Sequence, residues 1–152
     1  MKGKLSAVVI GLVFAGLVLA TAAFAQNGTG RGGWGVHSRY GKLYNPATVE
    51  TIVGQVSSVD KFTPVHGMST GVHLTVKTGR ENISVHLGPA WFIEKQSVRI
   101  EPKDTVEVTG SRITFDGKPA IIAAKVKKGD HVLKLRGKNG IPVWSGWRRR
   151  AR

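Results

Sequence analysis

The sequence predicts an all-β fold: a small barrel of five strands with one short helix and an added hairpin near the C-terminus. Two observations predict it. Apolar and polar residues alternate with a period of two along several stretches between residues 48 and 136. Turn-forming pairs such as Gly79-Arg80 and Asp116-Gly117 separate these stretches. Short alternating runs joined by tight turns are typical of an antiparallel sheet.

The first predicted strand covers residues 48–59, which are rich in β-branched side chains. Gly54 lies inside it, where a bend or bulge is expected. Residues 60–70 are predicted to form a loop, because they contain Pro64 and Gly67 among polar residues.

The second and third strands, residues 71–78 and 81–88, form a hairpin whose register can be written down from the alternation. Gly79-Arg80 suits a two-residue type II′ turn, which pairs Thr78 with Glu81. The pairs on the face predicted to join the core are then Val76–Ile83, Leu74–Val85 and Val72–Leu87. The pairs on the opposite, polar face are Lys77–Asn82, Thr75–Ser84 and His73–His86.

A short helix is predicted next, because Pro89 suits a first helical position and good helix formers follow it. Its side chains Trp91, Phe92 or Ile93 are expected to close the barrel floor. Strands then follow at residues 104–115 and 120–127, and residues 131–136 and 141–144 form the terminal hairpin. Three strands, a helix and two strands are the chain order of the OB-fold, a five-stranded, partly open Greek-key barrel. Another small barrel, of the SH3 or PRC type, is the main alternative.

Residues 47–128 resemble a known family. The export signal described below, the strand order, and the stretch Asp104-x-Val106-x-Val108-x-Gly110 followed by Ile122-x-Ala124-x-x-Val126 resemble the bacterial OB-fold family of small periplasmic proteins. The chain is also similar to small exported OB-fold proteins, some of which carry a DNA-binding label. The resemblance implies a barrel that binds a ligand, and it implies no catalytic residues. The chain departs from the family in its basicity, its Gly-rich arm and its C-terminal hairpin and tail.

Four segments are predicted along the chain. Residues 1–25 read as a signal peptide, with Lys2 and Lys4 ahead of an apolar stretch and Ala23-Phe24-Ala25 as the cleavage site; an uncleaved membrane anchor is the alternative. Residues 26–45 read as a flexible Gly-rich arm, residues 46–136 as the barrel, and residues 137–152 as the hairpin end with a basic tail. The expected location is periplasmic or secreted.

Charge and cysteine content limit the function. The chain has no Cys, which excludes disulfides, thiol catalysis, iron–sulfur clusters, c-type haem attachment and Cys-ligated zinc. It holds 23 Lys and Arg against 9 Asp and Glu; from residue 26 onward 21 Lys and Arg remain, a net charge of +12. Such an excess predicts a polyanionic partner: nucleic acid, anionic lipid, lipopolysaccharide phosphate or acidic glycan.

The polar face of the hairpin is the first candidate site, because OB-folds bind ligands on strands two and three. The predicted ligand-binding residues are His73, Thr75, Lys77, Ser84 and His86 on this face, with Arg80 at the hairpin tip. Hydroxyl groups and cations of this kind bind a phosphodiester or a small anion. An ordinary solvated sheet face is the alternative. No Phe, Tyr or Trp is predicted on this face, which argues against base stacking there.

His73 and His86 also form a candidate metal site, since paired residues on neighbouring strands have Cβ atoms about 4.5–5.5 Å apart. The pair could share Zn²⁺ or Cu²⁺, with His66 of the preceding loop as a third ligand. Two exposed or stacked histidines without metal are the alternative.

The C-terminal tail is the second candidate contact, to an anionic polymer or an anionic envelope component. Trp144, Trp147, Arg148, Arg149 and Arg150 combine indole rings with cations that bind phosphate. In the alternative the indoles pack on the barrel and the arginines stay solvated. Catalysis is not expected, because no acid orients a histidine and no nucleophile motif is present. The sequence therefore predicts a non-catalytic binding module for an anionic partner. The alternatives are a metal- or small-ligand-binding protein and an envelope-associated structural protein held by its tail.

Overall fold

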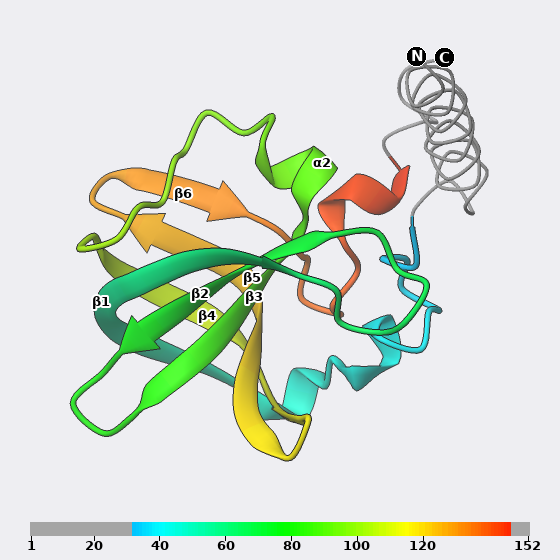
Figure 1. Cartoon of the computed structure of the whole chain (residues 1–152), viewed down its shortest axis with the longest axis horizontal. Helices are drawn as coiled ribbons and strands as arrows, with labels where there is room; N and C mark the ends of the chain where they lie inside the picture. Colours follow the sequence, from blue (N-terminus) through cyan, green and yellow to red (C-terminus); the bar gives the residue numbers. More distant parts are fainter. Residues whose placement is uncertain (1–31, 147–152) are drawn as a thin grey trace, which may run out of the picture. The chain divides into compact units, whose positions relative to one another are not determined.

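The computed structural model describes residues 32–146 (Figure 1). The described residues belong to one compact unit. The predicted signal peptide, Trp147 and the tail arginines lie outside the described residues. The elements are η1 (Gly41–Leu43), η2 (Pro46–Thr48), β1 (Val49–Phe62), β2 (Gly71–Lys77), β3 (Asn82–Pro89), α2 (Ala90–Ile93), β4 (Thr105–Phe115), β5 (Lys118–Lys128), β6 (His131–Lys134) and η3 (Val143–Gly146).

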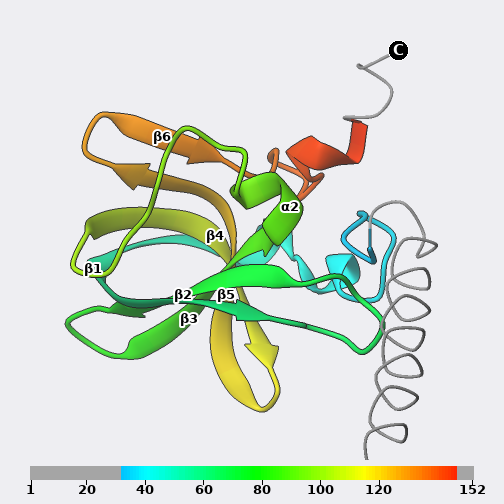
Figure 2. The same ribbon diagram turned by 45° about the horizontal axis from the view of Figure 1, so that its top comes forward.

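Five strands close into a ring. The order around it is β1–β2–β3–β5–β4, and β4 pairs back to β1. The β3–β5 pairing is parallel and joins Ser84–His86 to Ala120–Ile122, whereas the other pairings are antiparallel. α2 follows β3 in the chain (Figures 1 and 2). The predicted fold class is confirmed: an all-β barrel of five strands with one short helix between the third and fourth. Within residues 32–146, no helix is long and apolar enough to cross a bilayer.

β1 contributes to both sides of the barrel, as expected for a long first strand. Its residues 49–55 pair with β4, and its residues 55–62 pair with β2. The predicted irregularity is misplaced: the bulge lies between Val56 and Ser58 and not at Gly54. Gly54 has another role, because a Cβ at this position would collide with the carbonyl oxygen of Lys77. The glycine lets β1 and β2 approach closely where β1 leaves β4.

The predicted register of the β2–β3 hairpin is confirmed at five pairs. They are His73–His86, Leu74–Val85, Thr75–Ser84, Val76–Ile83 and Lys77–Asn82. The predicted pair Val72–Leu87 is wrong, because a bulge places Val72 opposite Gly88. Gly88 lies under the Trp144 ring, and a Cβ there would come within 2.8 Å of that ring. The bulge thus coincides with a contact made by a residue far along the chain.

The predicted type II′ turn is wrong, because Gly79 does not have the positive φ that this turn requires. Instead, the Thr78 hydroxyl oxygen accepts hydrogen bonds from the backbone N–H groups of Arg80 and Glu81, each at 3.1 Å. The turn predicted at Asp116-Gly117 is present. Both residues have positive φ, 55° and 76°, which is the type I′ conformation.

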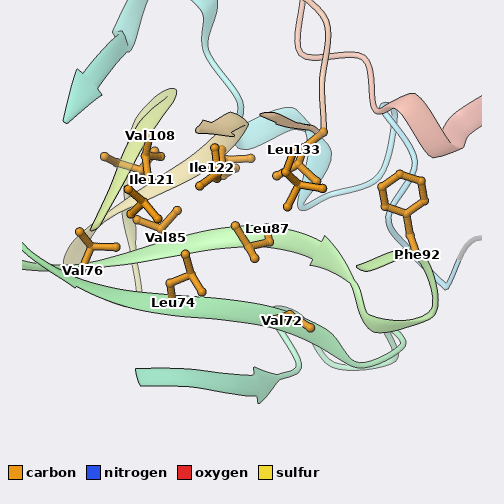
Figure 3. Close-up of a cluster of buried hydrophobic side chains, with 14 of the residues drawn as sticks. Val72, Leu74, Val76, Val85, Leu87, Phe92, Val108, Ile121, Ile122 and Leu133 are labelled. Atoms are coloured by element: carbon orange, nitrogen blue, oxygen red, sulfur yellow. The ribbon is translucent and has the colours of Figure 1, made fainter. Parts of the chain in front are cut away.

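The core face of the hairpin is buried as predicted. In Figure 3, Leu74, Val85 and Leu87 face Ile121 and Ile122 of β5. All five side chains are almost fully buried. α2 adds Phe92 to this core, while Trp91 and Ile93 are only partly buried. Of the three helix residues predicted for this role, Phe92 is therefore the one that joins the core, where it packs on Trp144.

The segment before β1 corrects one prediction. Residues 32–45, predicted as part of a flexible arm, pack on the barrel: Trp34 and Tyr40 are each 1% exposed. Trp34 Nε1 donates a hydrogen bond to the carbonyl oxygen of Ser69 at 3.0 Å, and Trp144 Nε1 donates one to the carbonyl oxygen of Trp34 at 3.0 Å. Buried aromatic rings stabilise a segment enough to offset the backbone entropy of its glycines.

The predicted terminal hairpin is present in reduced form. β6 pairs with β5 and extends the sheet to six strands. The returning arm makes one bridge, Arg136 with Pro142, flanked by the hydrogen bonds Gly137 N–H to Ile141 O at 2.9 Å and Val143 N–H to Leu135 O at 3.0 Å. The chain then turns into η3 instead of continuing as a strand.

Candidate functional site

The hairpin sets the predicted ligand residues in pairs across β2 and β3. His73 is opposite His86, and Thr75 is opposite Ser84. The two imidazole centroids are 6.3 Å apart and nearly perpendicular. His73 Nδ1 and the Ser84 hydroxyl form a 2.9 Å hydrogen bond. The sequence therefore located this group correctly on neighbouring strands.

The same group is not an exposed platform, because aromatic side chains cover His86. His86 is 2% exposed. The Tyr40 ring stacks on it with centroids 5.9 Å apart, and the rings of Phe62 and Phe115 lie at 4.6 and 4.9 Å. The prediction of an open ligand surface is wrong at this position. Thr75 and Ser84 are half-buried, and Lys77 and Arg80 are exposed.

Sequence reasoning missed the covering residues. Tyr40 was assigned to a flexible arm and Phe62 to a loop, although β1 runs to Phe62. Val59 and Phe62 are three residues apart and fall on opposite faces of β1, so the period-two pattern gives no signal for Phe62. No local pattern shows that Tyr40 packs on a residue 46 positions later.

Burial makes His86 a neutral structural residue. A 2.9 Å hydrogen bond joins its Nδ1 to the Tyr40 hydroxyl, and the tautomer of His86 decides which atom donates. Burial lowers the pKa of His86 to about 3, and repulsion from His73 and Arg136 adds to this effect. Burial also raises the pKa of Tyr40 well above its ordinary value, so the phenol keeps its proton.

The arrangement does not favour a metal between the two histidines. Both Nδ1 atoms already have hydrogen-bond partners, and the Phe62 ring packs on both imidazoles, 4.7 Å from His73 and 4.6 Å from His86. Residues 32–146 contain no group of three or more His, Asp or Glu side chains arranged to hold a metal ion, so His66 does not complete a site. Zinc or copper at this position would have two protein ligands at most.

A groove of about 400 Å³ lies between β1 and the hairpin tip. Its lining includes Glu50, Arg80, Glu81 and Arg112. Arg112 donates to Glu50 Oε1 at 2.8 Å and to both carboxylate oxygens of Glu81 at 3.1 Å. The hydrogen bond from Arg112 lowers the pKa of Glu81. The groove therefore carries charges that neutralise one another, which does not favour an anion.

Trp144, which the sequence predicts to contact an anionic partner, is buried instead, and so is the cation Arg136. Trp144 is almost fully buried and packs on Trp34 and Phe92. Arg136 is 5% exposed, and its guanidinium lies over the rings of Tyr44 at 5.7 Å and Trp144 at 5.2 Å. Desolvation by burial lowers the pKa of Arg136, and cation–π contacts replace a carboxylate partner. The other predicted tail contacts lie outside the described residues.

Besides Lys77 and Arg80 at the hairpin tip, two further surfaces carry exposed cations. On the outer face of β5 and β6, Lys125 lies directly opposite Lys134, an arrangement of like charges that is unfavourable by itself. Beside the barrel, Arg39, Lys42 and Lys138 are exposed. Within residues 32–146, none of these five side chains has an ion-pair partner.

Comparison with known proteins identifies the barrel. The model of the MamS/MamX magnetosome protein family matches residues 48–133, more than half of the 152 residues. The chain belongs to this family. The match runs from the end of η2 to β6 and so contains the whole five-stranded ring. The family description carries neither an OB-fold assignment nor a DNA-binding label. None of the curated proteins matches the chain.

Acidic residues are confined to the range matched by the family model, whereas basic residues also lie on either side of it. All 9 Asp and Glu lie between Glu50 and Asp130, inside the matched range. The same range holds 11 Lys and Arg. Residues 31–47 hold three Lys and Arg and no acid, and residues 134–152 hold seven and no acid. The family barrel is thus close to neutral, and the segments on either side of it are purely basic. We call residues 32–47 and 134–146 the flanking segments.

Proposed function

We propose that this protein is a non-catalytic binding module whose anionic partner, a nucleic acid or another polyanion, contacts the flanking segments and not the hairpin face. The observation that carries the proposal is the separation of charge. The acids neutralise the barrel, while ten Lys and Arg in residues 31–47 and 134–152 have no acid in their own segments. A surface of one charge sign attracts and orients a partner of the opposite sign.

The fold supports this by joining the two flanking segments. The Tyr44 ring packs on Gly140, where a Cβ would collide with it, and the Arg136 guanidinium lies over the same ring. Lys42 and Lys138 each lie two residues from this contact and are exposed. Their charges therefore add on one part of the surface, and the sequence continues into Arg148, Arg149, Arg150 and Arg152.

The compartment is part of the proposal. The predicted signal peptide supports a periplasmic or secreted location, and the magnetosome description of the family is consistent with it. The alternative function, metal or small-ligand binding at His73 and His86, gains no support from a pair in which His86 is buried and hydrogen-bonded.

The test is a binding measurement between residues 26–152 and labelled single-stranded DNA across a salt series. One variant removes three flanking cations, Arg39→Gln, Lys42→Gln and Lys138→Gln. The matched control removes three exposed barrel cations, Lys77→Gln, Arg80→Gln and Lys118→Gln. Lys77 and Arg80 are ligand-binding residues predicted from the sequence. Residues 32–146 contain the core and belong to one compact unit, so the chain from residue 26 is a suitable sample.

We expect tight binding at low salt that weakens steeply as salt rises. The flanking variant should reduce the slope of log affinity against log salt by about two, since each contact with a single strand contributes about 0.7. The control should keep the parent slope. An equal loss of affinity in both variants would show that net charge alone determines binding, which contradicts the proposal. A loss of affinity in the control alone would identify the hairpin face as the binding surface. Absence of binding by the parent would end the proposal.

A further inference from the structure

The flanking segments expose apolar side chains as well as cations. Six large hydrophobic side chains are exposed in residues 32–146. Three of them lie on the flanking segments: Leu43 (39% exposed), Ile141 (50%) and Val143 (40%). The other three, Val49, Val53 and Val132, lie on barrel strands. Single exposed aliphatic residues are ordinary, so the position of the first three carries the argument.

These three residues lie close to the contact that joins the flanking segments. Leu43 precedes Tyr44, and Ile141 follows Gly140, the residue on which the Tyr44 ring packs. Val143 is held to Leu135 by a 3.0 Å backbone hydrogen bond, next to Arg136, whose guanidinium covers Tyr44. Figures 1 and 2 both show the two segments on the same side of the barrel.

Each segment carries a cation close to these apolar residues. Lys42 is adjacent to Leu43, and Lys138 lies three residues before Ile141. Beyond Gly146 the sequence continues as Trp147-Arg148-Arg149-Arg150-Ala151-Arg152. Aliphatic side chains, an indole and cations without acids are the combination that binds an anionic bilayer: the apolar groups enter the head-group region, and the cations bind lipid phosphate. A soluble polyanion would use the cations alone.

We infer that the flanking segments dock this protein on the surface of an anionic lipid bilayer. Leu43, Ile141 and Val143 enter the head-group region, and Lys42 and Lys138 contact the phosphates. This inference rests on the proposed function, since it names the anionic partner of the same surface. It adds a requirement for hydrocarbon contact that binding to a polyanion in solution does not have.

The test measures partitioning of residues 26–152 into vesicles of phosphatidylcholine with 30% phosphatidylglycerol, with pure phosphatidylcholine vesicles for comparison. The flanking variant is Leu43→Ser, Ile141→Ser and Val143→Ser. The matched control is Val49→Ser, Val53→Ser and Val132→Ser, which removes the other three exposed side chains. Binding of each variant to single-stranded DNA is measured in parallel.

We expect strong partitioning into the anionic vesicles only. The flanking variant should partition about 100-fold less, because each half-exposed aliphatic side chain loses roughly half its transfer free energy. It should bind DNA like the parent, and the control should partition within about threefold of the parent. Vesicle binding that survives in the flanking variant, or that falls equally in the control, would overturn the inference. Binding of DNA but not of vesicles would overturn it and leave the proposed function standing; binding of neither would end both.

A second measurement does not depend on the triple variants. Because the chain has no Cys, a single Ile141→Cys or Val53→Cys carries an environment-sensitive dye at one known position. A blue shift on anionic vesicles is expected at position 141 and not at position 53. The opposite pattern, or a shift of equal size at both, would contradict docking through the flanking segments.

Discussion

The contact between Tyr40 and His86 allows a sharp test of how the N-terminal flanking segment is held on the barrel. The substitution Tyr40→Phe removes one oxygen atom. It keeps the ring that packs on Trp34, with centroids 5.0 Å apart, and on His86. The substitution deletes the 2.9 Å hydrogen bond between the Tyr40 hydroxyl and His86 Nδ1. It leaves that nitrogen without a partner on a side chain that is only 2% exposed.

The expected cost follows from that unpaired nitrogen. A buried polar group that loses its only partner costs about 1–3 kcal/mol. For a domain of this size, 1 kcal/mol corresponds to a change of about 4 °C in Tm. Tyr40→Phe should therefore lower Tm by about 4–12 °C.

Tyr44→Phe is the matched control. Tyr44 is also buried among the flanking segments, but its hydroxyl makes no hydrogen bond to the described residues, and the ring under Arg136 is retained. We expect a change below about 0.5 kcal/mol in this control. Urea unfolding and calorimetry at neutral pH measure both variants. A Tyr40→Phe protein as stable as its parent, or a Tyr44→Phe protein equally destabilised, would refute the role given to this hydrogen bond.

Three further results are expected. Since the pKa of folded His86 is about 3 and an unfolded histidine has a pKa near 6.5, only the unfolded state binds a proton between these values. The contribution of His86 to the free energy of unfolding is constant above about pH 7 and falls by about 1.4 kcal/mol per pH unit below the unfolded pKa. Urea unfolding at pH 7 and pH 4.5 should therefore show that His86→Gln loses less stability on acidification than the parent does. An equal loss in both proteins would contradict the assignment of His86 as a buried, neutral histidine. Gly71→Ala should destabilise by about 1–3 kcal/mol, because its Cβ collides with the Trp34 ring, and wild-type stability in thermal unfolding would show that the indole is not held there. Gly79→Ala should be neutral or slightly stabilising, since its φ is not positive and no atom lies within 4 Å of the added Cβ; a clear loss of stability would restore the type II′ turn.

The strands and the hairpin could be predicted because their signals are local. Alternation places Leu74 and Val85 on the core face, and the pairing of His73 with His86 follows from counting outward from the turn. The bulge at Gly88 could not be predicted in this way, since it coincides with packing under Trp144, 56 residues later. A register counted from a turn holds only up to the first bulge.

The candidate site was harder to predict because its surroundings come from distant parts of the chain. The glycines of residues 28–35 favour a flexible segment, and nothing nearby shows that Trp34 and Tyr40 are buried against Ser69 and His86. The covered face of His86 and the burial of Trp144 follow from these contacts. The segregation of acids into residues 50–130 is visible in the sequence, but a net charge summed over the whole chain conceals it.

The most direct test of the proposed binding surface is an NMR titration of isotope-labelled residues 26–152 with a short single-stranded oligonucleotide. The flanking-segment account predicts that backbone amide signals move at Arg39, Lys42 and Lys138, and that those of Lys77 and Arg80 stay in place. Shifts concentrated on residues 71–88, with the flanking segments unchanged, would contradict it.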